Sequence, residues 1–170
     1  MAGLIAGRTP GDMPGLDIAE QKSWQSFLDC GLRLYATLNR RLTEEHQLSL
    51  TDVRVLDLLA NAADGSARMG DLAEALASLP SRLTRQIGRL EAQGLVRRGA
   101  SPDDRRGVVA SITEDGRTVW RQAMLTYGQG VRTYYLGQLS RAQMAAMGEN
   151  CRRISAVLKR SDRAAKLGQI

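Results

Sequence analysis

Apolar residues return every three or four positions along much of the chain, and this spacing predicts amphipathic helices. The first long pattern lies in residues 17–47 and opens with "DIAE", where Glu20 follows Asp17 at the spacing of a capping box. We expect its apolar stripe to be buried, either in a core or against a partner chain. The stripe consists of Trp24, Phe27, Leu28, Gly31, Tyr35, Leu38 and Leu42.

Three shorter helical patterns follow. The first, in "TDVRVLDLLANAADG", predicts a helix from Thr51 to Gly65 that turns Val53, Leu56 and Leu59 inward. The segments "GDLAEALASL" and "LPSRLTRQIGRLEAQG" predict two more helices, the second ending at Gly94. Three short helices are therefore expected after the long one.

The pattern then changes to short β-branched runs. The segments "GLVRRGA" and "GVVASIT" predict two strands, and "SPDDRR" between them predicts a turn. A proline fixes one φ angle there, and the aspartates can bond their own backbone. The sequence therefore predicts a two-stranded hairpin with two arginines at its tip.

Helical spacing returns for the rest of the chain. One apolar face comprises Trp120, Met124, Tyr127, Val131 and Tyr134; a second follows the capping-box sequence "SRAQ" and comprises Met144, Met147, Cys151, Ile154 and Leu158. The helices at both ends are too apolar on one face to stand alone. We therefore expect a dimer, with packing inside one chain as the alternative.

Most of the net positive charge of the chain lies in one segment. The 170 residues are 43% hydrophobic and 25% charged, which is typical of one globular chain with a core. Of the net charge of +6, residues 82–106 contribute +4, from seven arginines against three acids. Arginine suits forked recognition of phosphates and base edges, so this segment predicts an anionic partner.

Several classes of protein are disfavoured. Two cysteines are too few for a disulfide framework and fit a reducing cytoplasm. Residues 1–16, with four glycines and two prolines, are expected to form a flexible tail rather than a signal peptide, and no segment is long enough to span a membrane.

Catalytic and metal-binding motifs are also missing from the sequence. There is no phosphate-loop motif, no dinucleotide fingerprint and one histidine, so we expect no enzyme and no cofactor. One histidine and two distant cysteines lack the spacing of zinc ligands, so we expect no metal site either.

The helix in residues 80–92 has two contrasting faces. At about 100° per residue, Leu83, Ile87 and Leu90 share one face, and the opposite face carries Arg82, Arg85, Gln86 and Arg89. Arginine can bond guanine and glutamine can bond adenine in a major groove. Followed by a hairpin, this helix predicts a helix-turn-helix with a wing; the alternative is an ordinary solvated face.

The segment from about Leu48 to Met124 resembles the MarR (multiple antibiotic resistance regulator) family of winged helix-turn-helix transcriptional regulators. The matching segments are "LSLTDVRVLDLL", "MGDLAEALASLPSRLTRQIGRLEAQGLVRR" and "PDDRRGVVASITEDGR". The most specific feature is "DRR" running into T-x-x-G. The resemblance implies a mainly α (α+β) fold: a winged lobe (48–113) with a two-stranded wing, and dimerisation helices (17–47 and 114–170).

The resemblance also implies a function. It predicts a homodimeric repressor that binds a pseudo-palindromic operator in double-stranded DNA. By position, the DNA contacts would be Ser81, Arg82, Arg85, Gln86, Arg89, Asp104, Arg105 and Arg106. Arg106 matches the arginine that enters the minor groove, and Asp104 matches the acid that holds the wing by pairing with an arginine.

Sensing by a small molecule is a further expectation from the resemblance. An aromatic or phenolic effector would release the DNA, and its cavity would be lined by Trp24, Phe27, His46 and Trp120, unless these are ordinary core or interface residues. For His46, near a helix end, a capping or solvent-facing role is favoured over ligation.

Two other modes of action remain open. One is oxidant sensing through Cys30, whose pKa Arg33 would lower, the alternative being a buried inert thiol. The other is a winged-helix protein that coats DNA without sequence preference, or that serves as an adaptor for another protein.

Overall fold

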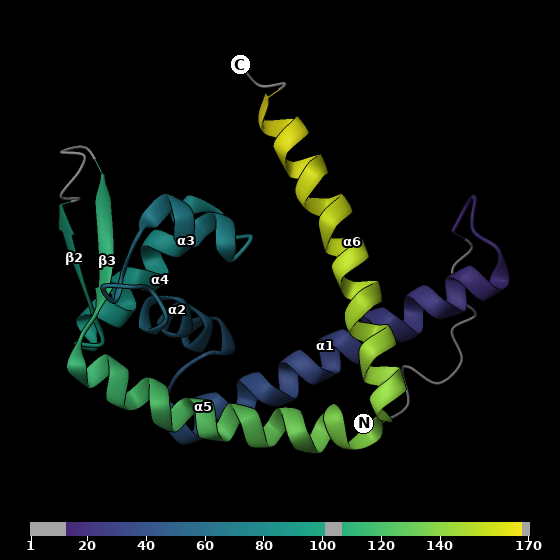
Figure 1. Ribbon diagram of the computed structural model, residues 1–170, viewed down its shortest axis with the longest axis horizontal. Helices are drawn as coiled ribbons and strands as arrows, with labels where there is room; N and C mark the ends of the chain where they lie inside the picture. Colours follow the sequence, from purple (N-terminus) through teal and green to yellow (C-terminus); the bar gives the residue numbers. More distant parts are fainter. Residues whose placement is uncertain (1–12, 101–106, 168–170) are drawn as a thin grey trace, which may run out of the picture. The chain divides into compact units, whose positions relative to one another are not determined.

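The computed structural model describes residues 13–100 and 107–167. The chain divides into two compact units, Met1–Tyr127 and Gly128–Ile170. The elements are α1 (Ile18–His46), α2 (Leu50–Ala60), β1 (Ser66–Arg68), α3 (Met69–Ala75), α4 (Pro80–Ala92), β2 (Val96–Ala100), β3 (Val108–Ile112), α5 (Glu114–Tyr134), the 3-10 helix η1 (Leu136–Gln138) and α6 (Arg141–Leu167). Figure 1 labels the six α-helices and the strands β2 and β3. The predicted order of helices and hairpin is confirmed.

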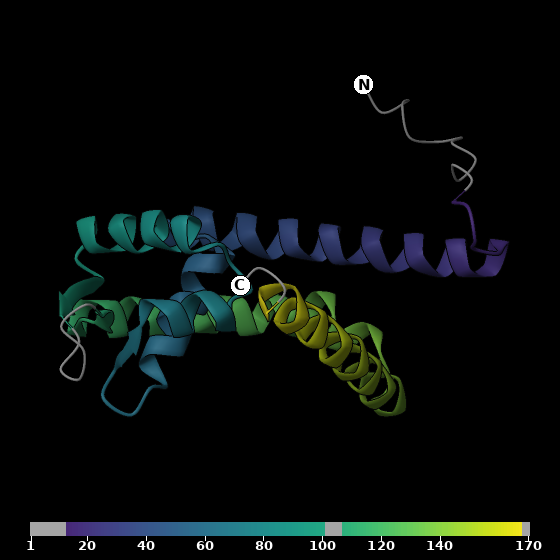
Figure 2. The ribbon, with the colours of Figure 1, turned by 90° about the horizontal axis from the view of Figure 1, so that it is seen from above.

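The start of α1 is set by its capping box, as predicted. The Asp17 carboxylate accepts a hydrogen bond from the Glu20 N–H at 2.9 Å, and the Glu20 carboxylate accepts from the Asp17 N–H at 2.8 Å. The helix continues without a break to His46 (Figure 2). It ends where Gln47 adopts a left-handed φ of 58° and turns the chain toward α2.

The predicted limits of the next helix were wrong. Its N-cap is Ser49, which shares a capping box with Asp52, and its last residue is Ala60 rather than Gly65. Gly65 instead adopts a left-handed φ of 72° in the turn that leads into β1. The three residues expected to face inward, Val53, Leu56 and Leu59, are buried as predicted.

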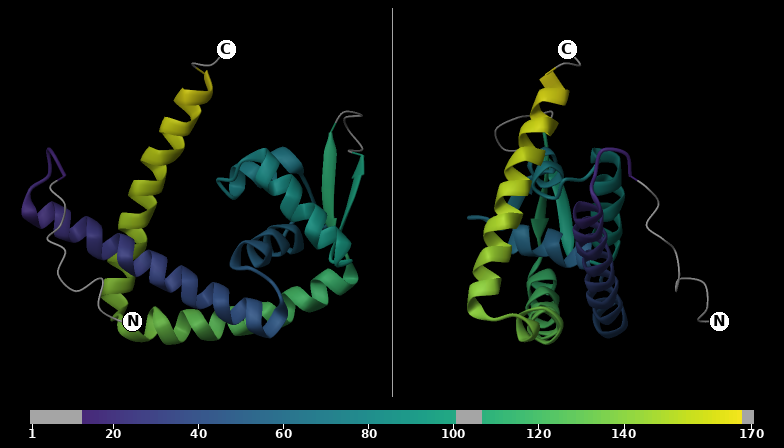
Figure 3. Two further views of the ribbon diagram at one scale, coloured as in Figure 1. Left: turned by 180° about the vertical axis from the view of Figure 1, so that it is seen from behind. Right: turned by 90° about the vertical axis from the view of Figure 1, so that its right-hand side faces the viewer.

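A small antiparallel sheet follows the order β1-β3-β2. Strands β2 and β3 lie side by side in Figures 1 and 3. The predicted hairpin is confirmed as β2 paired with β3, with Val96 opposite Ile112. The sheet has a third strand that was not predicted, because β1 is only three residues long and shows no clear alternation. The Ser66 and Ser111 hydroxyls join β1 to β3 at 2.8 Å.

The core of the first unit lies between α2, α4 and the sheet. Leu83, Ile87 and Leu90 of α4 are 0% exposed, which confirms the predicted inner face of this helix. They are buried together with Val55, Leu56, Leu59, Leu72, Val96 and Ala110. One polar face of α4 is therefore left for other contacts.

The T-x-x-G sequence joins the sheet to α5. The Thr113 hydroxyl donates to the Gly94 carbonyl at 2.7 Å and accepts from the Gly116 N–H at 2.9 Å. A Cβ atom on Gly116 would overlap the carbonyl oxygen of Leu95. The glycine is required because the backbone of the β2 segment passes directly against α5.

Long apolar stripes remain exposed in the described single chain. Only Leu38 and Leu42 of the predicted α1 stripe are buried, whereas Trp24, Phe27, Leu28 and Tyr35 are exposed. In the second unit, α6 is a continuous helix (Figure 3) capped by Ser140 and Gln143. Its exposed apolar residues include Met147, Ile154, Val157 and Leu158. No described helix is both long enough and apolar enough to cross a membrane.

Candidate nucleic-acid interface

The polar face of α4 carries the side chains predicted to meet DNA. Pro80 occupies the first helical turn, and Leu79 before it gives no side-chain cap, as the sequence predicts. Ser81, Arg82, Arg85 and Arg89 are exposed, and Gln86 is half-buried. The helix is thus held in place by its buried leucine and isoleucine side chains, while its arginines remain accessible.

Asp52 of α2 bonds two residues of this face. One terminal nitrogen of Arg89 donates to both Asp52 carboxylate oxygens, at 2.6 and 2.8 Å. The Gln86 amide nitrogen donates to Oδ1 of the same carboxylate at 3.0 Å. Two of the predicted DNA-contacting side chains are therefore already oriented by a residue outside α4.

The same carboxylate also caps α2. Its Oδ2 accepts from the Ser49 hydroxyl at 2.6 Å and from the Ser49 N–H at 2.9 Å. The Asp52 side chain is only 3% exposed, whereas that of Arg89 is 56% exposed. A buried carboxylate with this many donors links the first turn of α2 to α4, while about half of the Arg89 side chain stays exposed to solvent.

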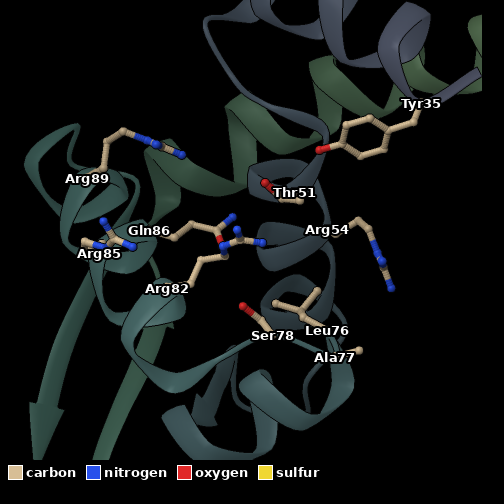
Figure 4. Close-up of a pocket in the computed structure, with 10 residues that line it drawn as sticks. All are labelled: Tyr35, Thr51, Arg54, Leu76, Ala77, Ser78, Arg82, Arg85, Gln86 and Arg89. Atoms are coloured by element: carbon tan, nitrogen blue, oxygen red, sulfur yellow. The ribbon is translucent and has the colours of Figure 1, made fainter. Parts of the chain in front are cut away.

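A basic hollow of about 530 Å³ opens beside α4. The basic hollow is lined by Tyr35, Thr51, Arg54, Leu76, Ala77, Ser78, Arg82, Arg85, Gln86 and Arg89. Figure 4 shows Arg82 and Gln86 extending from α4 toward α2, with Arg54 at the opposite margin of the hollow from Arg85 and Arg89. Apart from Arg89, its arginines form no ion pair with described residues.

The base of the wing is fixed to the last turns of α4. Arg98 of β2 donates through its guanidinium to Glu91 at 2.6 Å, and its N–H donates to the same carboxylate at 3.1 Å. These hydrogen bonds hold the pKa of Glu91 below its ordinary value. The predicted wing contacts Asp104, Arg105 and Arg106 lie outside the described residues.

The four residues predicted to line an effector cavity are not brought together within one chain. Trp24 and Phe27 are neighbours near the start of α1, with ring centroids 6.0 Å apart. His46 ends the same helix, roughly 30 Å away at 1.5 Å of rise per residue. Neither tryptophan, nor Phe27, nor His46 lines the basic hollow.

His46, which is half-buried in the last turn of α1, links α1 to α5, and the alternative that it caps α1 was wrong. Its Nε2 lies 2.8 Å from the Thr126 hydroxyl, which itself donates to Glu45 at 2.8 Å. Because the hydroxyl proton is already used, Nε2 must act as the donor. The bond from Thr126 is the main cause that lowers the pKa of Glu45. The C-cap of α1 is Gln47 instead.

Trp120 and Cys30 carry the remaining sensing predictions. The half-buried Trp120 has a buried Nε1–H without a hydrogen-bond partner among the described residues. Cys30 is a free, exposed thiol in the described chain, so the alternative of a buried cysteine was wrong for the single chain. Among the described side chains, no group of three or more histidine, cysteine or acidic residues could hold a metal ion.

The sequence did not identify Asp52, Arg54 or Tyr35 as part of the candidate site. The capping-box spacing between Ser49 and Asp52 was a signal for the carboxylate, although not for its bond to Arg89. Tyr35 was assigned to an apolar stripe, but its ring also lines the basic hollow. Nothing in the local sequence distinguishes Arg54 from any other surface arginine.

Comparisons with known proteins match this arrangement. A family model described as the MarR family matches residues 46–107. A curated relative from Bacillus subtilis (strain 168), the uncharacterized HTH-type transcriptional regulator YfiV, is 36% identical over 74 residues. That match covers 44% of this chain and 45% of the relative, so it spans less than half of the relative's length.

Two solved structures cover much more of the chain, and both are MarR family transcriptional regulators from Streptomyces coelicolor. AbsC has a TM-score of 0.81 at 28% identity, covering 86% of this chain and 99% of its own. Sco3205, solved in complex with DNA, has a TM-score of 0.82 at 30% identity, covering 84% of this chain and 93% of its own.

Proposed function

The chain belongs to the MarR family of transcriptional regulators, and we propose that it acts as a homodimer that binds an operator in double-stranded DNA. The observation that carries this proposal is the arginine-rich face of α4, which is exposed while the opposite face is fully buried. The similar protein Sco3205 is solved in complex with DNA, which supports DNA as the partner.

Each part of the chain has a role in this proposal. Residues 48–113 read DNA, residues 17–47 and 114–170 form the dimer, and residues 1–16 are a tail. The exposed apolar stripes of α1 and α6 support dimerisation, because a lone chain leaves them in water. A two-fold dimer presents two lobes, so its operator is a pseudo-palindrome with half-sites about one helical turn, or 34 Å, apart.

The proposed contacts divide by position. Arg82 and Arg85 read base edges in the major groove, and Ser81 at the start of α4 contacts a phosphate. Gln86 and Arg89 reach DNA from positions set by Asp52. On the wing, Arg105 and Arg106 approach the minor groove, where Arg106 enters and Asp104 holds the turn by pairing with an arginine.

Repression and its release complete the proposal. A dimer seated on an operator excludes the transcription machinery, and a small aromatic or phenolic effector releases it. The buried Nε1–H of Trp120, which has no hydrogen-bond partner in the part of the chain that the structure describes, supports a polar contact to such a molecule. Trp24, Phe27 and His46 are the other proposed residues. The exposure of Cys30 favours one alternative input, oxidation of its thiol.

Fluorescence anisotropy across a salt series tests the proposal. The purified protein is titrated against the duplex upstream of its own gene and against a scrambled duplex of the same composition. Tight binding of two subunits to the native duplex alone is the expected result. Equal and steeply salt-dependent binding to both duplexes would instead indicate a protein that coats DNA by its phosphates. Phenols and peroxide are then screened on the same complex.

A further inference from the structure

The basic hollow contains donors that the reading face of α4 does not account for. Arg54 and Thr51 come from α2, Tyr35 from α1 and Ser78 from the turn before α4 (Figure 4). Arg54 and Tyr35 are exposed, and neither makes a hydrogen bond or ion pair with a described residue. The Thr51 hydroxyl is already bonded to that of Ser49, and the Ser78 hydroxyl donates to the Leu79 carbonyl. Arg54 and Tyr35 are therefore the donors from outside α4 that remain uncommitted among the described residues around this opening.

We propose that this hollow seats a sugar–phosphate strand of the operator beside the reading helix, with Arg54 as a phosphate contact. The inference rests on the proposed DNA-binding function. A helix about 10–12 Å wide nearly fills a major groove about 12 Å wide, so a phosphate strand borders it on each side. The hollow lies along one side of α4, between that helix and α2.

The chemistry of the lining fits a phosphate strand. Arginine guanidinium and the hydroxyls of serine, threonine and tyrosine are common donors to phosphate and sugar oxygens. The lining residues of the hollow include no acid, and the buried Asp52 beside it is paired with Arg89, so Arg54, Arg82 and Arg85 leave the hollow positively charged. Arg54 lies at the opposite margin of the hollow from Arg85 (Figure 4), so an anionic chain between them would meet an arginine on each side.

The consequence is a division of labour between two arginines on the same surface. Arg85, on α4, reaches base edges and sets sequence preference. Arg54, on α2, contacts only the backbone and therefore contributes equally to any duplex. The hollow extends the DNA-binding surface beyond helix and wing to include α1 and α2.

Arg54→Ala and Arg54→Lys test the proposed phosphate contact in the basic hollow. Arg132→Ala is the control, because it removes the same charge from an exposed arginine of α5 outside the hollow. Anisotropy is measured on the native and scrambled duplexes across a salt series. Arg54→Ala should weaken both complexes by the same factor and reduce the salt slope by about one unit. Arg54→Lys should keep most of the slope, and Arg132→Ala all of it.

Phosphate-ethylation interference locates the contact. We expect at least one phosphate in each half-site whose ethylation weakens wild-type binding but does not affect Arg54→Ala. If Arg54→Ala leaves the salt slope of DNA binding unchanged, or changes the base preference, the proposed phosphate contact of Arg54 is wrong. Operator binding by the wild type would still stand in that case. A wild type that binds both duplexes equally refutes operator recognition. The difference in salt slope between the wild type and Arg54→Ala still tests the phosphate contact. A wild type that binds neither duplex overturns both proposals.

Discussion

Arg89 donates from one terminal nitrogen to both carboxylate oxygens of Asp52, at 2.6 and 2.8 Å, and so joins the exposed face of α4 to the first turn of α2. The Asp52 side chain is almost completely buried, whereas the Arg89 side chain is 56% exposed. An arginine on a free helix face would sample many rotamers, and each would have to be given up on binding DNA. The ion pair removes much of that freedom before DNA arrives.

Asp52→Asn should therefore impair both stability and recognition. The amide keeps the shape but loses the charge that bonds Arg89. We expect a loss of about 1–2 kcal/mol in the free energy of unfolding, since the partly exposed arginine is screened by solvent. Denaturant unfolding measures that loss, and anisotropy on native and scrambled duplexes measures the accompanying fall in sequence preference.

Ser49→Ala is the matched control for that variant. It removes the side-chain cap of α2, at about 1 kcal/mol, but leaves the bond between Asp52 and Arg89 in place. Sequence preference should therefore survive in Ser49→Ala and fall in Asp52→Asn. Equal effects of the two variants on preference would mean that Asp52 acts only by stabilising α2.

Arg85→Ala should change which sequence is bound. The Arg85 side chain is exposed and makes no ion pair with a described residue, so its removal disturbs no observed contact. We expect a cost of roughly 1–3 kcal/mol on the native operator and relaxed preference at one position in each half-site. A binding assay against a library of single-base operator variants measures both. Equal losses on every sequence would contradict a base-reading role.

Arg106→Ala should instead weaken binding broadly. Its role follows from the position in the wing sequence, which the described residues do not include. A minor-groove or phosphate contact predicts similar losses on related duplexes and a salt slope smaller by about one unit. The same salt series measures this variant beside Arg85→Ala. A change in major-groove base preference without a change in slope would contradict the assignment.

Gly116→Ala should destabilise the first unit. The added Cβ atom would overlap the Leu95 carbonyl oxygen, which is backbone and has little room to move, and it would also crowd the Ile112 side chain. We expect a loss of about 2–3 kcal/mol in denaturant unfolding. Gly88→Ala is the control: its Cβ would meet nothing within 4 Å in α4, and it should stabilise the helix by about 0.5–1 kcal/mol. Similar losses in both would show that helix context, not the contact with Leu95, dominates.

Features with a local cause could be predicted from the sequence. The start of α1 follows from Asp17 and Glu20, because a capping box needs only residues three apart. The inner face of α4 follows from periodicity alone. The end of α2 was missed because Gly65 marks the turn into β1 rather than the end of the helix. Strand β1 was missed because three residues carry too little pattern, and its pairing with β3 is a contact distant in sequence.

The candidate site shows the same limit. The arginines of α4 could be found from the sequence, because side chains on one helix share a face by spacing. Asp52 and Arg89 are 37 residues apart, and only the packing of α2 against α4 brings them into contact. The bond from His46 to Thr126 likewise joins helices 80 residues apart in sequence. Periodicity identifies a face of a helix, but it does not identify what that face meets.

Acid should weaken the attachment of the wing to α4. Hydrogen bonds from Arg98 lower the pKa of Glu91 below its ordinary value of 4.5, so the folded state favours the ionised carboxylate. The stabilising contribution is therefore present above pH 4.5 and is lost as the pH falls through the lowered pKa. Denaturant midpoints measured from about pH 3 to 6 should fall less steeply in Glu91→Gln. Parallel pH profiles for this variant and the wild type would refute this contribution.

The exposed apolar stripe of α1 predicts that a charged substitution in it prevents dimerisation. Phe27 is 50% exposed in the single chain, and its ring lies 6.0 Å from that of Trp24, so the pair presents an apolar surface to water. If that surface is buried between subunits, Phe27→Glu places an unpaired charge in the interface and should yield a folded monomer. Sedimentation measures the mass, and circular dichroism measures the helix content. Lys22→Glu, an exposed charge reversal on the same helix, should stay dimeric.

Operator binding should fall together with dimerisation in Phe27→Glu, because one lobe alone reads only a half-site. A dimeric Phe27→Glu protein with full operator affinity would place the subunit interface on another surface.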